Sequence, residues 1–308
     1  NAISAWWEVI FFTGRCIWIR FTRFVPYLAG RVTECHSNVF ICVVLAPIPV
    51  EVSPGSRARM RREKSSPTAR PGSKLARYCI VETGLTPSLL QSEYGTMPEM
   101  VTDLLRPYMP TAEFITVSPV LGEALGKPED YAGLVFLGSE HSVLDDLGWV
   151  TALRCWIRQA ATSSVPMVGI CFGHQLMAQA LGGEVQRGDW VVGAKEYTAS
   201  DQTGTVRSVA YHQDQVCQPA PDAEVWLTHP ECQYAGFIYQ SIPACSVQSH
   251  PEFCAEFSRA LFEFTRDEVL TGEQTNAAVA STHKALDVAP IVGQFANTLT
   301  QPGMATQT

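Results

Sequence analysis

Apolar runs and amphipathic segments alternate along most of this chain. Short apolar runs typical of buried strands occur at 77–82 (RYCIVE), 113–117 (EFITV) and 132–138 (AGLVFLG). Segments with helical periodicity lie between and after them, at 97–109 and 147–161. Strands that alternate with helices favour a parallel sheet covered by helices on both faces.

The pattern changes after Gly183. Short runs such as EVWLT and AGFIYQ follow, and they are typical of an antiparallel or mixed extension of the sheet. Helical periodicity returns near the end of the chain in two apolar stripes, Phe257, Leu261 and Phe264, and then Ile291, Phe295 and Leu299. The sequence therefore predicts a three-layer α/β fold, with a mostly parallel sheet, helices on both faces and an added antiparallel portion.

The composition separates a folded domain from what precedes it. Residues 51–74 are rich in Pro, Ser and Arg, which is typical of flexible segments. We assign 60–74 to a disordered linker, 75–302 to the folded domain and 303–308 to a flexible tail.

The first part of the chain is an atypical apolar and basic extension. The chain begins with Asn1 rather than Met, and Met60 lies just before the predicted domain. We hypothesise that residues 1–59 are not part of the natural product or do not fold, which mass spectrometry of the native amino terminus would test. The alternative is a genuine extension that docks through its tryptophans.

The formal net charge of −8 conceals a division along the chain. Residues 1–78 carry 12 Lys and Arg against 4 Asp and Glu, whereas residues 79–308 carry 10 against 26. An acidic main body repels the phosphate backbone, so the sequence argues against a nucleic-acid partner.

The cysteines favour the cytoplasm, and the apolar runs near the start of the chain argue against a membrane span. The ten cysteines are scattered and form no CxxC pair or zinc pattern, which suits a reduced compartment. The apolar segment at 5–24 is interrupted by four charged residues, well short of the ~20 apolar residues of a membrane span. It also lacks the order of a signal peptide.

Cys171 stands at the joint between an apolar strand and a helix, in the stretch GICFGHQ. Gly169 and Gly173 occupy the two positions where small residues relieve crowding in a sharp strand-to-helix turn. The positive end of the following helix would favour the thiolate, and the N–H group of Phe172 could hold an oxyanion. The alternative is a buried, inert cysteine in a tight turn.

A second motif, SVQSHPEF at 246–253, supplies a histidine and a carboxylate. Pro251 biases His250 toward an extended conformation, in which residues two apart project to the same side. His250 and Glu252 can therefore face one site, as a nucleophilic cysteine would require. A strand-end turn with a solvated glutamate is the alternative.

GICFGHQ followed by QSHPEF resembles the class I (triad) glutamine amidotransferases, which carry a nucleophile elbow and a His-Pro-Glu motif in this order. YCIVETG, LVFLGSEHSVLDD, LGGEV and YHQDQV resemble further segments of that family, so the resemblance extends from residue 75 to about 300. The chain looks most similar to the stand-alone GMP-synthase-like branch and to plant γ-glutamyl peptidases. The resemblance implies a flavodoxin-like sheet.

The resemblance also implies a Cys-His-Glu triad. Cys171 would be the nucleophile, His250 the general base and acid, and Glu252 the group that orients His250. The thiolate would attack a γ-glutamyl amide carbonyl, the imidazole would protonate the leaving amine, and water would release glutamate from the thioester. This chemistry needs no metal and no organic cofactor.

Four further residues are carried over as an oxyanion and substrate-binding group. Gly138 and Phe172 would donate backbone N–H groups to the oxyanion, Ser139 would belong to the same loop, and Gln175 would bind the glutamyl portion. The chain departs from many relatives in having Ser249 before the histidine. Its GSEHSV loop also lacks the Gly-Gly-Pro of biosynthetic synthases.

The predicted function is hydrolysis of a γ-glutamyl amide, either glutamine or a γ-glutamyl peptide. Transfer of ammonia would require a separate synthase partner, because the chain has no P-loop or other obvious nucleotide-binding segment. Two alternatives remain open: a catalytically silent binding protein of this fold, and a thiol hydrolase of other esters or amides.

Several residues receive structural interpretations. We expect His174 to be packed or hydrogen-bonded, His212 to be structural or at the pocket rim, and Asp214 to order its loop. His141 could touch the substrate. The sequence assigns to the core four further residues, Cys155, Phe253, Phe257 and Phe264.

Overall fold

A computed structural model of the chain describes residues 7–13, 16–21, 39–44, 75–200 and 204–301. The chain divides into two compact units, Asn1–Ala69 and Arg70–Thr308. The linker and the tail predicted at 60–74 and 303–308 lie outside the described residues. Whether residues 1–59 belong to the natural product stays a prediction, as do the domain boundaries.

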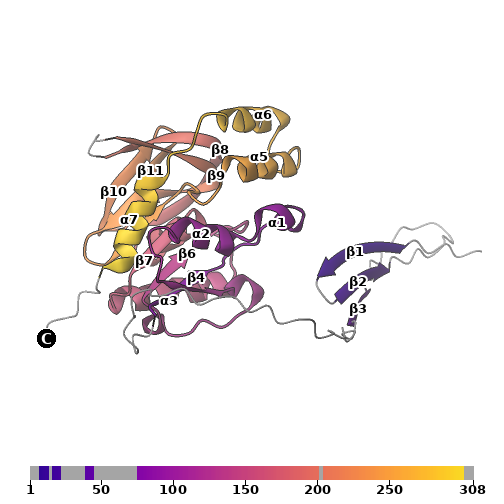
Figure 1. The fold of residues 1–308 in the computed structure, drawn as a ribbon, viewed down its shortest axis with the longest axis horizontal. Helices are drawn as coiled ribbons and strands as arrows, with labels where there is room; N and C mark the ends of the chain where they lie inside the picture. The colour runs from indigo at the N-terminus through magenta and orange to yellow at the C-terminus, as the bar shows by residue number, and fades with distance from the viewer. Residues whose placement is uncertain (1–6, 14–15, 22–38, 45–74, 201–203, 302–308) are drawn as a thin grey trace, which may run out of the picture. The chain divides into compact units, whose positions relative to one another are not determined.

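The described residues of the first unit form three strands, labelled in Figure 1. They are β1 (Trp7–Thr13), β2 (Cys16–Phe21) and β3 (Val39–Val44). β2 lies between the other two and pairs antiparallel with both. A sheet of three strands is about the smallest that can form without further support.

The second unit is built on a sheet of nine strands (Figure 1). Five of them are parallel, in the spatial order β5 (Glu113–Val117), β4 (Arg77–Val81), β6 (Gly133–Phe136), β7 (Met167–Ile170) and β12 (Ala244–Val247). The remaining four extend the sheet antiparallel, in the order β11 (Cys232–Tyr239), β10 (Ala223–His229), β8 (Glu184–Ala199) and β9 (Thr205–Gln218). The predicted three-layer fold with an antiparallel addition is confirmed.

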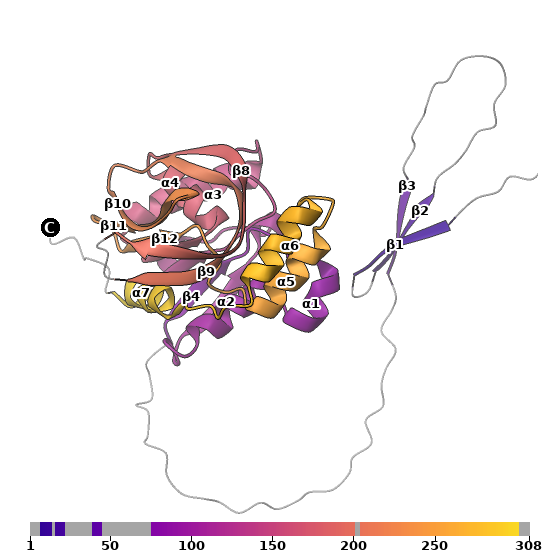
Figure 2. The ribbon, with the colours of Figure 1, turned by 90° about the horizontal axis from the view of Figure 1, so that it is seen from above.

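Helices cover both faces of this sheet, as Figure 2 shows. The helices are α1 (Ser88–Tyr94), α2 (Met97–Leu105), α3 (Gly148–Thr162), α4 (Phe172–Ala180), α5 (Ala255–Phe264), α6 (Gly272–Ser281) and α7 (Ala289–Thr300), with short 3₁₀ turns at Pro119–Leu121 and Pro128–Asp130. α2 and α7 pack on one face, and α3 and α4 on the other. No helix among the described residues is both long and apolar enough to cross a bilayer.

The second unit has two hydrophobic cores, one on each face of the sheet. They arise because successive side chains along a strand point to opposite faces. In β4, Ile80 packs toward α2 and α7, whereas Cys79 and Val81 pack toward α3 and α4. The predicted stripe of α7 is confirmed, because Ile291, Phe295 and Leu299 are buried.

The antiparallel region differs from the short runs expected from the sequence. β8 and β9 form one long hairpin of 16 and 14 residues. Gly193 in β8 has φ +97°, and a Cβ there would lie 2.7 Å from Ser281 Oγ, so glycine suits this close approach of the hairpin to α6. Polar residues on the exposed side of the hairpin divide its sequence into short apolar runs, which hides the continuous strands.

Two core predictions are wrong. Cys155 is exposed, because α3 buries Leu153, Trp156 and Ile157 and the cysteine falls on the other side of the helix. Phe264 is 42% exposed, because it is the last residue of α5 and extends beyond the buried stripe.

Candidate active site

Cys171 occupies a strained position between β7 and α4. Its φ is 51° and its ψ is −103°, a conformation that non-glycine residues rarely adopt. A Cβ on Gly169 would lie 2.7 Å from Met177 Sδ, and one on Gly173 would lie 2.3 Å from the carbonyl oxygen of Phe136. The two glycines therefore allow α4 to pack directly against the parallel strands and to hold the cysteine at their carboxyl edge.

The Cys171 side chain is 5% exposed and lines a pocket. The amide nitrogen of Gln248 donates a hydrogen bond to its sulfur at 3.6 Å, which stabilises a negative sulfur. Cys171 also precedes the first residue of α4, where backbone N–H groups and the helix dipole favour an anion. The surroundings suit a thiolate.

His250 and Glu252 face one another at the same pocket. His250 Nδ1 donates a hydrogen bond to Glu252 Oε1 at 2.7 Å. This contact does not use the other ring nitrogen, Nε2. The backbone N–H of His250 donates to the carbonyl oxygen of Val209 in β9 at 2.7 Å. The histidine is thus held by the antiparallel region as well as by the turn that follows β12.

The pKa of His250 is strongly perturbed. Burial lowers it, because burial disfavours the imidazolium. The negative charges of Cys171 and Glu252 outweigh that effect and raise the pKa of His250 to about 10. At neutral pH the arrangement therefore suits a protonated imidazole at His250.

Gly138 lies directly against the His250 ring. A Cβ at this position would lie 2.7 Å from His250 Cε1, so any larger residue would displace the imidazole. Thr83 Oγ1 donates to the carbonyl oxygens of Leu137 and Gly138, each at 2.9 Å, and Ser139 Oγ donates to the carbonyl of Thr83 at 2.6 Å. The loop after β6 is thereby fixed beside the histidine.

The oxyanion and substrate-binding residues predicted from the sequence lie around this pocket. Ser139, Phe172 and Gln175 line it, and Gly138 contacts His250, which also lines it. Phe172 is the first residue of α4, so its N–H has no partner within the helix. The structure brings these residues together with Cys171, and their roles stay predictions.

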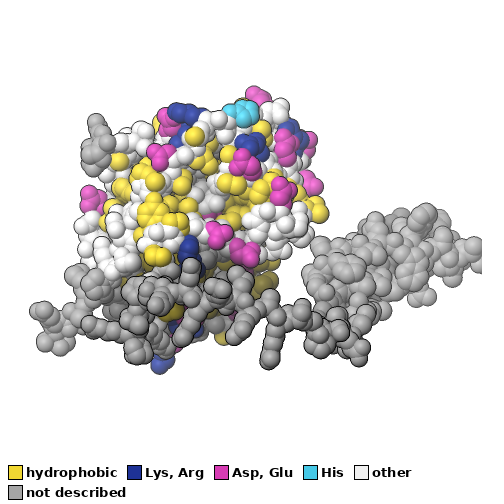
Figure 3. Space-filling view, in the orientation of Figure 1, with side chains coloured by type: hydrophobic (Ala, Val, Ile, Leu, Met, Phe, Trp, Pro, Cys, Tyr) yellow, Lys and Arg dark blue, Asp and Glu magenta, His cyan; other side chains and the backbone are white. Residues whose placement is uncertain are grey.

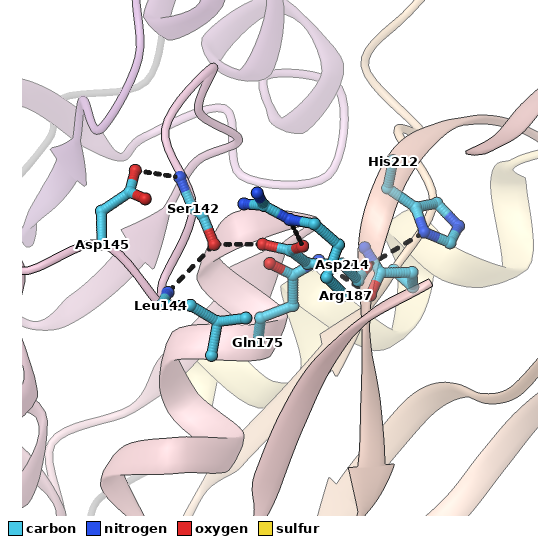
Figure 4. A network of polar contacts seen from close by, with 8 residues as sticks. Ser142, Leu144, Asp145, Gln175, Arg187, His212 and Asp214 are labelled. Carbon is cyan, nitrogen blue, oxygen red and sulfur yellow. Dashed lines mark hydrogen bonds and ion pairs between the residues drawn. The ribbon is translucent and has the colours of Figure 1, made fainter. Parts of the chain in front are cut away.

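A network of polar side chains covers one side of the pocket (Figure 4). Asp214, whose side chain is 8% exposed, lies 3.0 Å from Arg187 Nε and accepts a hydrogen bond from Ser142 Oγ. Gln175 Nε2 donates to the carbonyl of Asp214 at 2.8 Å. The network joins the loop after β6, the helix α4 and the hairpin of β8 and β9.

His212 belongs to the same network (Figure 4). Its Nδ1 donates to the carbonyl of Asp214 at 3.2 Å, and burial lowers its pKa to about 3, so the ring is neutral. Its other nitrogen has no hydrogen-bond partner among the described residues. His212 thus lines the pocket as a buried, neutral group, and the choice between a structural role and a place at the rim stays a prediction.

Sequence reasoning missed Arg187 altogether. Arg187 and Asp214 are 27 positions apart and meet as a cross-strand pair in the β8–β9 register. The pair could have been predicted only if 184–218 had been recognised as one long hairpin, because the pairing depends on its register. Gln248 was also missed, although it lies inside the QSHPEF motif, because its contact with Cys171 depends on the neighbouring strands.

His174 and His141 have different surroundings. His174 is fully buried, accepts from Ser246 Oγ at 2.8 Å and donates to the carbonyl of Tyr234 at 3.0 Å, so its predicted packing role is confirmed. His141 lines the pocket and packs edge-to-face on Trp149, with ring centroids 5.6 Å apart. Its predicted contact with substrate stays a prediction.

The fold and the comparison with known families define the class of protein. Residues 122–266 match the model of the family "Glutamine amidotransferase class-I". A solved structure of a glutamine amidotransferase from Methylobacillus flagellatus superposes with a TM-score of 0.59 at 20% identity, over 74% of this chain and 93% of that one. At that identity it supports the fold alone.

Two curated relatives refine the comparison. Gamma-glutamyl peptidase 4 of Arabidopsis thaliana is 28% identical over 171 residues, 51% of this chain and 66% of the relative. A glutamine-hydrolyzing GMP synthase subunit of Methanopyrus kandleri is 32% identical over 108 residues, 31% of this chain and 56% of the relative. The chain spans less than two thirds of the length of each.

Proposed function

We propose that this protein hydrolyses a γ-glutamyl amide bond through a thioester on Cys171. The observation that carries the proposal is the 2.7 Å hydrogen bond between His250 Nδ1 and Glu252, beside a strained cysteine in the same pocket. A histidine oriented by a buried carboxylate is the usual partner of an activated nucleophile.

In the first half-reaction the Cys171 thiolate attacks the amide carbonyl carbon and forms a C–S bond. The oxyanion accepts hydrogen bonds from the backbone N–H groups of Phe172 and Gly138. His250 Nε2 gives its proton to the amide nitrogen, the C–N bond breaks, and the amine leaves. A γ-glutamyl thioester remains on Cys171.

In the second half-reaction His250 changes its role. Once the sulfur is acylated it no longer carries the negative charge that helps to raise the pKa of His250. The imidazole, now neutral, accepts a proton from water, and the resulting hydroxide attacks the thioester carbonyl. The C–S bond breaks, glutamate leaves, and the Cys171 thiolate is regenerated.

The relatives support two versions of this reaction. The γ-glutamyl peptidase relative favours an amino acid or peptide as the leaving group, and the GMP synthase relative favours ammonia delivered to a separate synthase. We propose a cytoplasmic enzyme, in keeping with the seven free cysteines within 75–200 and 204–301. Its acidic body argues against nucleic acid as a partner.

The test is glutamate release by the purified full chain from glutamine and from γ-glutamyl peptides. Cys171→Ala should abolish release, whereas Cys155→Ala, which removes an exposed thiol far along α3, should not. Release from peptides alone would identify a peptidase. Absence of Cys171-dependent release from every substrate would refute the proposal and favour a silent binding protein.

A further inference from the structure

The pocket around Cys171 is lined by two chemically different groups of residues. One group is the polar network of Gln175, Asp214 and Arg187. The other group, which we name the apolar wall, consists of six residues, Trp190, Phe253, Phe257, Leu261, Phe264 and Val269. The cavity between them measures about 440 Å³, within the ~300–1,000 Å³ of pockets that hold drug-sized ligands.

The apolar wall begins at the His250 imidazole. The ring of Phe253 stacks on that of His250 with centroids 4.1 Å apart and planes 6° apart. Phe257 packs edge-to-face on Phe253 at 4.6 Å, and Leu261 and Phe264 continue along α5 by helical periodicity. A continuous apolar path therefore leads from His250 along α5.

The mouth of the pocket is also apolar. Among the described residues, three of the eight exposed large hydrophobic side chains line this one pocket: Leu85 (41% exposed), Phe264 (42%) and Val269 (43%). Figure 3 shows hydrophobic side chains exposed among charged ones around α5 and α1. Such exposure leaves apolar surface in water, and a bound apolar group would cover it.

The reaction geometry says which part of a substrate meets this wall. In the proposed function, on which this inference rests, His250 protonates the leaving nitrogen, so that nitrogen must lie within hydrogen-bond distance of the imidazole. We expect the substituent on the nitrogen to extend from His250 along Phe253 and α5, because these apolar side chains adjoin the imidazole. We expect the glutamyl portion, on the other side of the scissile bond, to meet the polar network that includes Gln175.

We infer that the preferred substrates are γ-glutamyl amides whose amine portion is hydrophobic, and that the apolar wall selects them over glutamine. Free glutamine leaves ammonia, which would cover none of the wall. An aromatic or branched aliphatic amine portion would bury apolar surface of its own together with that of Phe264 and Val269.

The experiment compares γ-glutamylphenylalanine with γ-glutamylglycine, which differ only in the side chain of the leaving amino acid, and includes glutamine. The full chain should hydrolyse γ-glutamylphenylalanine with a kcat/KM about tenfold to a hundredfold above that for γ-glutamylglycine. Phe264→Ser should reduce this ratio by roughly tenfold. Leu121→Ser, which changes an equally apolar but more exposed residue (63%) that does not line the pocket, should leave the ratio unchanged.

The outcomes separate this inference from the proposed function. Equal kcat/KM values for the two peptides, with release that depends on Cys171, would overturn the inference and leave the proposed function standing. A ratio that Phe264→Ser and Leu121→Ser lower equally would also overturn it. Absence of Cys171-dependent release from all three substrates would overturn both.

Discussion

At the scale of single residues, the candidate site depends on close approaches that only small or charged side chains permit. Gly138 admits the His250 ring, and Glu252 holds its Nδ1. The second carboxylate oxygen of Glu252 has no hydrogen-bond partner among the described residues, so His250 is the principal compensation for this buried charge.

Gly138→Ala should reduce kcat/KM for γ-glutamyl hydrolysis by roughly 10²-fold, the cost of a displacement of about 1 Å in an active site. The added Cβ would lie 2.7 Å from His250 Cε1, and ordinary contact begins at 3.4 Å, so the ring must move by about 0.7 Å. Gly148→Ala is the matched control, because a Cβ there meets nothing within 4 Å. Equal activity of the two variants would contradict the placement of His250.

Glu252→Gln keeps the shape of the side chain and removes its charge. Because the carboxylate raises the pKa of His250, the substitution should lower that pKa. The alkaline limb of the kcat/KM profile should therefore move to lower pH, and activity at neutral pH should fall by roughly 10²- to 10⁴-fold. Glu256→Gln, on the exposed side of α5, is the control. If the alkaline limb of Glu252→Gln did not move, the result would contradict the pairing of His250 with Glu252.

At the scale of elements, side chains hold helices and strands in the places that the site needs. His174 ties α4 to β11 and β12 through Tyr234 and Ser246. The hairpin of β8 and β9 brings Arg187 opposite Asp214. In α2, which forms part of the pocket through Met97, a capping box of Thr96 and Glu99 fixes the first turn.

Thr96→Ala should lower the free energy of unfolding by about 1 kcal/mol, the usual loss for an N-cap. Thr96 Oγ1 accepts a hydrogen bond from the N–H of Glu99 at 3.3 Å, and alanine cannot replace it. Chemical denaturation measures the change. Thr102→Ala, the same substitution inside α2, should be nearly neutral, and an equal loss in both variants would argue against the cap.

His174→Gln should make stability less dependent on pH in mildly acidic solution. Burial lowers the pKa of His174 to about 3, so the folded protein keeps it neutral while the unfolded chain binds a proton below about 6.5. As the pH falls from about 6.5 toward 3, the free energy of unfolding of the wild type therefore decreases by ~1.4 kcal/mol per pH unit through this residue. Above about pH 6.5 both states are neutral at this position, and the residue contributes no pH dependence. Denaturation at several pH values should show a shallower slope in the variant; equal slopes would contradict the neutral, buried state.

For the protein as a whole, the described residues of the site all lie in the second unit. Both hydrophobic cores of that unit and every residue of the pocket lie within residues 75–301. A chain of residues 70–308 should therefore keep the kcat/KM and the melting temperature of the full chain, measured side by side. A large loss of either would show that the first unit supports the site.

Much of this architecture could be predicted from local pattern. The parallel strands are short, largely apolar runs, and α3 and α7 have clear helical stripes, so periodicity predicts them. α6 was missed because it buries only Thr275 and Ala278, and α1 because it buries none of its residues. Helices with so little apolar surface owe their place to neighbours and caps.

Local sequence was sufficient to predict the parallel strands in their chain order, the sharp turn at Cys171 and the spacing that lets His250 meet Glu252, because these depend on residues close together in the chain. The tertiary structure alone decided that Gly138 lies against His250, that Arg187 meets Asp214, and that Phe264 lines a pocket instead of the core. Those contacts join distant segments, and strand register and helix packing, which local sequence does not encode, bring them together.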